Sequence, residues 1–110
     1  MNVFKIDNRY INVDSIEFIE IDGNNTEIGF NKYSISIDRN ILNEVEELTK
    51  KYEFLVNLKE GSCINLNHIN YIEFDGLLKV NWKNHNYTKV FIIEDKYRDD
   101  IHSLLEGVCK

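Results

Sequence analysis

Two stretches of this 110-residue chain nearly repeat each other: INVDSIEFIEIDG at residues 11–23 and INLNHINYIEFDG at residues 64–76. They align without a gap at an offset of 53, and seven of the thirteen positions are identical. Such self-similarity indicates a duplicated structural unit. The match extends outward with small shifts, and no Pro- or Gly-rich linker separates the copies. We therefore expect one domain, residues 1–110, built from repeat one (3–52) and repeat two (54–109).

Each copy has the pattern of three strands followed by a helix. Alternating apolar residues predict a long third strand over residues 28–37 of the first copy. Asp22-Gly23 and Asp75-Gly76 predict hairpin turns, because Gly accepts a positive φ. Apolar stripes at residues 41–48 and 97–108 predict the closing helices. The predicted fold class is α+β, with two β-β-β-α repeats packed with pseudo-twofold symmetry.

The composition argues for an acidic protein that stays in the cytoplasm. Thirteen basic against nineteen acidic residues give a net charge of −6, which disfavours both nucleic acid and anionic membrane surfaces. The chain has no apolar run of membrane-spanning length and no signal-peptide pattern at its start. Cys63 and Cys109 fit reduced thiols, with a single disulfide between them as the alternative. Residues with AT-rich codons are abundant, which indicates a low-GC bacterium or its phage.

No catalytic or metal-binding motif is present. The chain lacks a Gly-rich phosphate loop, a nucleophile elbow and a His-Glu-x-x-His element. Its two cysteines and three histidines are scattered, and the Cys63–His68 spacing is not a zinc spacing. The sequence therefore predicts no enzyme, no catalytic residues, no metal and no cofactor.

Charge points instead to a protein partner. Residues 1–53 carry six basic and eleven acidic residues, against seven and eight in residues 54–110. The leading prediction is a non-enzymatic protein-binding module, a small accessory or inhibitory protein that occupies a basic surface on its target. The predicted binding residues are Glu17, Glu20, Asp22 and Glu27, and negligible binding to duplex DNA is expected. A homo-oligomer is left open.

The repeated element Ile-Asn-x-x-x-Ile-x-x-Ile-Glu, at residues 11–20 and 64–73, resembles two families. One is the FlbD-like small bacterial proteins and their phage relatives, which implies a strand, an Ile-Asn turn, a second strand, a hairpin and a closing helix. The other is the LytTR DNA-binding domain, through Phe54 followed by residues 65–69. LytTR domains are basic and carry Arg and His before that Asn, where this chain has residues 56–59, Val-Asn-Leu-Lys. This resemblance implies a topology but supplies no DNA-contacting residues.

One segment of repeat two favours nucleic acid and carries the alternative function, a LytTR-like nucleic-acid-binding regulator. Residues 81–89 interleave aromatic and basic side chains, which can stack on bases and contact phosphates. The candidate residues are Trp82, Lys83, His85, Tyr87 and Lys89. The structural interpretation of the same segment is a hairpin with one core tryptophan, because Trp82 aligns with Phe30 of repeat one.

Overall fold

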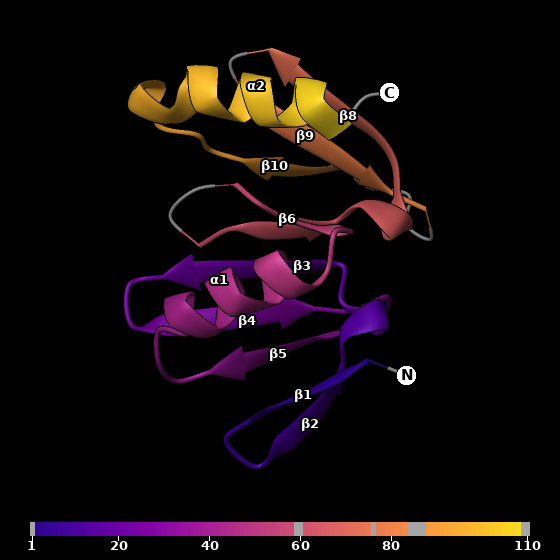
Figure 1. The fold of residues 1–110 in the computed structure, drawn as a ribbon, viewed down its shortest axis with the longest axis vertical. Helices are drawn as coiled ribbons and strands as arrows, with labels where there is room; N and C mark the ends of the chain where they lie inside the picture. The colour runs from indigo at the N-terminus through magenta and orange to yellow at the C-terminus, as the bar shows by residue number, and fades with distance from the viewer. Residues whose placement is uncertain (1, 59–60, 76, 84–87, 109–110) are drawn as a thin grey trace. The chain divides into compact units, whose positions relative to one another are not determined.

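The computed structural model describes residues 2–58, 61–75, 77–83 and 88–108. These residues form ten strands and two α-helices, so the predicted α+β class is confirmed. In chain order the elements are β1 (Val3–Ile6), β2 (Arg9–Asn12), the 3-10 turn η1 (Val13–Ser15), β3 (Phe18–Asp22), β4 (Asn25–Gly29), β5 (Ser34–Ile37), α1 (Leu42–Lys51), β6 (Leu55–Asn57), β7 (Cys63–Asn65), η2 (Leu66–His68), β8 (Ile69–Asp75), β9 (Leu77–Trp82), β10 (Thr88–Phe91), η3 (Asp95–Tyr97) and α2 (Arg98–Val108). Contacts divide the chain into two compact units, residues 1–65 and 66–110 (Figure 1).

Each half of the chain has five strands before its helix, so the predicted three-strand unit is wrong. Two local features break the predicted strands of repeat one. The Asn12 side chain accepts a hydrogen bond from the Asp14 N–H at 3.2 Å, which favours the turn η1 over a continued strand. Further on, the Phe30 N–H donates to the Tyr33 carbonyl at 2.8 Å and folds the long third strand back on itself as β4 and β5.

The first unit contains a two-stranded sheet, β1-β2, and a five-stranded sheet in the order β5-β4-β3-β7-β6. The boundary between the units falls after the repeat junction because β7 pairs with β3, with Ile64 opposite Phe18. Helix α1 packs over the five-stranded sheet (Figure 1). One buried cluster of this unit contains Ile6, Ile11, Val13, Ile16, Ile19, Ile28, Ile37, Ile41, Val45, Leu48, Leu55 and Cys63.

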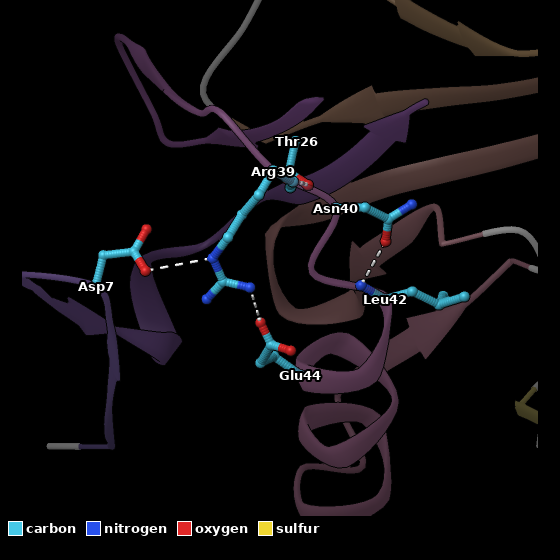
Figure 2. Close-up of polar contacts among 6 residues, drawn as sticks. All are labelled: Asp7, Thr26, Arg39, Asn40, Leu42 and Glu44. Carbon is cyan, nitrogen blue, oxygen red and sulfur yellow. Dashed lines mark hydrogen bonds and ion pairs between the residues drawn. The ribbon is translucent and has the colours of Figure 1, made fainter. Parts of the chain in front are cut away.

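Polar contacts fix the loop that leads into α1 (Figure 2). The Asn40 Oδ1 atom accepts from the Leu42 N–H at 2.9 Å, which satisfies a backbone donor at the helix start. The Arg39 guanidinium donates to Asp7 Oδ1 at 3.3 Å and to Glu44 Oε2 at 2.8 Å. Arg39 therefore links the β1–β2 turn, where Asp7 has a φ of 56°, to the first turn of α1.

The second unit is the three-stranded antiparallel sheet β10-β9-β8 with helix α2 (Figure 1). Alternation along β9 buries Leu78, Val80 and Trp82 and leaves the intervening side chains exposed or half-buried. Helix α2 adds the buried Ile101, and its His102 ring stacks on Phe74 of β8 with 4.3 Å between centroids. The core side chains of this unit therefore come from both the sheet and the helix.

Candidate functional site

The four carboxylates predicted to bind a protein partner do not form one exposed face. Glu17 is buried, with only 1% of its surface exposed, directly before β3. Glu20 and Glu27 lie opposite each other on β3 and β4 and are half-buried, and only Asp22 at the end of β3 is exposed.

The residues of the alternative site also separate. Trp82 is completely buried, so its ring is a core residue that cannot stack on a base. Lys83 is exposed at the end of β9, whereas Lys89 lies opposite the buried Val80 with its Nζ atom 5.4 Å from the centroid of the Phe91 ring. His85 and Tyr87 lie outside the described residues.

Polar side chains gather instead around the side of the three-stranded sheet opposite the Leu78–Trp82 stripe. In the ladder, Asn81 lies between Tyr71 on β8 and Thr88 on β10, and Lys79 is two residues before it. The Asn70 Nδ2 atom donates to the Asn81 Oδ1 atom at 3.0 Å, beside a register shift in β8. We call this set the hairpin surface; it consists of Asn70, Tyr71, Lys79, Asn81, Lys83 and Thr88.

A backbone hydrogen bond fixes the end of the hairpin surface. The Lys83 N–H donates to the carbonyl oxygen of His68, the last residue of η2, at 2.8 Å. Within the described part of the chain, the side chains of Lys79 and Lys83 form no ion pair, although Glu73 lies opposite Lys79. Their positive charges remain available to a ligand.

Three other cations are paired with neighbouring carboxylates. Arg39 pairs with Asp7 and Glu44, and in the second unit Lys96 pairs with Glu94 at 3.4 Å and Arg98 with Asp95 at 2.9 Å. Hydrogen bonding to Glu44 raises the pKa of Arg39, as expected of a cation held by carboxylates. These residues are therefore weaker candidates for an anionic ligand than Lys79 and Lys83.

The acidic excess is concentrated in the first unit. Residues 1–65 carry seven basic and twelve acidic residues, whereas residues 66–110 carry six and seven. Between Asp75 and Glu94 the chain has three lysines and no acidic residue. The β9–β10 region is therefore locally basic within an acidic protein.

Nucleophilic and metal chemistry has little support. Cys63 is buried in the core of the first unit, and burial raises the pKa of its thiol to about 12, so it stays protonated at neutral pH. The described residues contain no group of three His, Cys, Asp or Glu side chains placed to hold a metal ion. Within the same residues, neither helix has the length and apolar character that a membrane crossing needs.

Comparison with known proteins identifies a similar fold. No family model matches the sequence, and no curated protein matches it. Among solved structures, the chain is similar to the LytTr DNA-binding domain of a putative methyl-accepting/DNA response regulator from Bacillus cereus. The two share 18% sequence identity, the match covers 94% of each chain, and the TM-score is 0.64. The fold is thus similar to that of a LytTR DNA-binding domain, and an FlbD-like resemblance is not shown.

This likeness overturns the leading prediction from the sequence. A match over nearly the whole chain to a DNA-binding domain contradicts a protein-binding inhibitor that occupies a basic surface, and it contradicts the expected lack of a nucleic-acid partner. Net charge misled because it averages over the chain. Charges separated by more than a Debye length, about 8 Å at physiological salt, are largely screened, so the local charge of a binding surface counts most.

Sequence reasoning missed most of the hairpin surface. Asn70 and Tyr71 occupy variable positions of the repeated element and Lys79 lies in β9, so no chemical motif marks them. One sequence signal for a basic surface is the stretch between Asp75 and Glu94, which has no acidic residue. Counting charges over each whole repeat does not reveal this stretch.

Proposed function

We propose that this chain is a non-catalytic DNA-binding domain of the LytTR type that acts as part of a cytoplasmic regulator. The observation that carries the proposal is the structural likeness to a LytTr DNA-binding domain over 94% of both chains. In this proposal the chain works as one domain. Its two halves are copies of one unit with pseudo-twofold symmetry, a view supported by the thirteen-residue repeat and by the shared order of five strands and a helix.

The hairpin surface is the part of the described chain that suits DNA best. Nonspecific affinity comes from Lys and Arg side chains that neutralise phosphates, and Lys79 and Lys83 are exposed and without acidic partners in the described residues. Asn is the residue type that reads adenine through its amide donor and acceptor, and Asn70 and Asn81 place two amides here, joined to each other by the bond from Asn70 Nδ2 to Asn81 Oδ1. β9 and β10 form an antiparallel pair at one edge of the three-stranded sheet, and β-strands are among the elements with which DNA-binding proteins read a groove.

Comparison of the two repeats supports this choice. Residues 12–18 align with residues 65–71, so Asp14 corresponds to Asn67, Ser15 to His68 and Glu17 to Asn70. Repeat one is acidic at this turn, and its Asp14 accepts from the Asn2 side chain at 3.2 Å. Repeat two replaces both acids with amides and adds a histidine. The change removes the repulsion that phosphates would meet at the equivalent turn of repeat one.

Duplex binding tests the proposal directly. A random 30-base-pair duplex library would be selected on the full chain, and the affinity for the enriched duplex measured by fluorescence anisotropy at about 100 mM salt, where counterion release still favours binding. We expect specific binding. The double variant Lys79→Glu/Lys83→Glu should lose at least about tenfold in affinity, because two phosphate contacts become repulsive.

The matched control is Lys32→Glu/Lys50→Glu, which makes the same charge change at two exposed lysines of the first unit. We expect this control to retain most of the wild-type affinity. Failure of the wild type to enrich or bind any duplex would contradict the proposed function. Equal losses in the two double variants would leave DNA binding in place and exclude the hairpin surface as its site.

A further inference from the structure

The second unit has a cleft between β8 and helix α2 that shares only Tyr71 with the hairpin surface. Its volume is about 550 Å³, within the range of small-molecule sites in proteins. Ile69, Ile72 and Phe74 supply apolar walls from the strand, and Leu105 supplies one from the helix. The cleft is therefore large and apolar enough to hold one face of a ligand of one or two rings, while it stays open on the other side.

Polar groups of the cleft lie together on one helix. His102 and Glu106 both line the cleft, and their spacing of four residues places them on the same face of α2. The imidazole of His102 stacks on the Phe74 ring at 4.3 Å with an angle of 22° between the rings, which provides an aromatic platform. Glu106 places a carboxylate one helical turn beyond that platform.

We propose that this cleft binds a small planar aromatic amine as a regulatory ligand. The aromatic part would pack against Phe74 and the aliphatic walls, since flat rings gain most from apolar and stacked contacts. The amino group would pair with the carboxylate of Glu106, the acidic side chain among the cleft residues. An aromatic acid of the same size would meet that carboxylate with like charge and bind more weakly.

The cleft adjoins the hairpin surface. Tyr71 lines the cleft and also lies opposite Asn81 in the sheet. Leu66 lines the cleft as well, and it starts η2, whose last residue accepts the hydrogen bond from the Lys83 N–H. Occupancy of the cleft would thus change the placement of groups that contact DNA, a coupling that rests on the proposed function.

Calorimetric titration of the full chain tests the cleft without any DNA. The probes are tryptamine, indole and indole-3-acetate, which share a ring system and differ in charge. We expect tryptamine to bind with a Kd on the order of 0.1–1 mM, as fits a ligand of about a dozen atoms, and indole-3-acetate to bind more weakly. Undetectable binding of tryptamine to the wild type would overturn the proposal.

Two charge-neutralising variants locate the amine. Glu106→Gln should weaken tryptamine about two- to fivefold, as expected for a partly exposed ion pair, and leave the affinity for indole unchanged. Asp100→Asn removes an exposed carboxylate from the same helix outside the cleft and should change neither affinity. Equal effects of the two variants on tryptamine would overturn the proposed position of the amine.

The regulatory part is tested by DNA anisotropy with and without saturating tryptamine. We expect the apparent Kd for the selected duplex to change at least about threefold in the wild type, with indole-3-acetate as a ligand control. Tryptamine binding with no change in DNA affinity would overturn the regulatory role. Absence of DNA binding altogether would count against the proposed function, whereas the calorimetric result would still decide whether the cleft is a ligand site.

Discussion

The side chain of Asn65 donates a hydrogen bond from Nδ2 to the backbone carbonyl of Ile16 at 2.8 Å, across 49 residues of sequence. Asn65 is completely buried, and its N–H also donates to the Glu17 carbonyl at 2.9 Å. The equivalent residue of repeat one, Asn12, is half-buried, and its side chain bonds to the near neighbours Asp14 and Ser15. The two asparagines of the repeated motif therefore have different structural roles.

Substitution of these asparagines should reveal the difference. Asn65→Ala leaves the buried Ile16 carbonyl without its donor and should lower the free energy of unfolding by about 2–3 kcal/mol. Asn12→Ala removes a local turn contact near the surface and should cost about 1 kcal/mol or less. Urea denaturation followed by circular dichroism would measure both. Similar losses in the two variants would show that the buried bond contributes no more than a turn contact.

Two glycines should respond to alanine in opposite directions. A Cβ on Gly29 would clash with the ring of Phe18, its partner across β3 and β4, so Gly29→Ala should destabilise the protein by about 1–3 kcal/mol. A Cβ on Gly107 in α2 meets nothing within 4 Å, so Gly107→Ala should stabilise the helix by roughly 0.5 kcal/mol. Melting temperatures provide the measurement. A stabilised Gly29→Ala would mean that the Phe18 ring moves aside freely.

Local sequence signals predicted part of the fold. Asp22-Gly23 marks the β3–β4 hairpin, where Gly23 has a φ of 62° that a glycine adopts without strain. The turn at Phe30–Tyr33 was missed because it contains no Gly or Pro. The turn is held by a backbone hydrogen bond and by the rings of Phe30 and Tyr33, whose centroids lie 5.2 Å apart. Neither contact changes the spacing of apolar residues from which strands are predicted.

Pairing between distant strands and the binding surface were harder to predict. That β7 joins β3 in one sheet depends on contacts such as Cys63 with Ile19, which no local pattern encodes. The sequence is compatible with Trp82 as a base-stacking residue and as a core residue, and its complete burial in the structure shows that it is a core residue. The hairpin surface combines residues from three strands, so its charge and amide groups come together only in the folded sheet.

Ionisation of Cys63 should make the stability fall at high pH. The unfolded thiol ionises near pH 9.0, whereas the folded thiol keeps its proton up to about pH 12 because of burial. The folded state thus binds more protons between these values. The thiol's contribution to stability is fully present below pH 9.0 and is lost as the pH rises toward 12, at up to about 1.4 kcal/mol per pH unit.

The variant Cys63→Ala isolates the contribution of the Cys63 thiol to the pH dependence of stability, because the other groups titrate equally in both proteins. We expect the stability difference between wild type and Cys63→Ala, measured in urea at pH 8, 9 and 10, to shrink as the pH rises. Both proteins should carry Cys109→Ser so that one thiol is compared. A difference that stays constant over these pH values would contradict an ionisable thiol in the folded core.

The salt dependence of DNA binding should reveal how many lysines contact phosphates. For duplex DNA, the slope of log Kd against log salt changes by about 0.9 for each neutralised phosphate. Lys79→Gln and Lys83→Gln should each reduce the slope by about that amount and weaken binding to all sequences alike. Lys32→Gln, at an exposed site in the first unit, is the control and should leave the slope unchanged. Anisotropy titrations between 50 and 200 mM salt, a range over which such contacts change affinity strongly, provide the slopes. If Lys79→Gln and Lys83→Gln keep the wild-type slope while DNA still binds, the phosphates are contacted elsewhere on the chain.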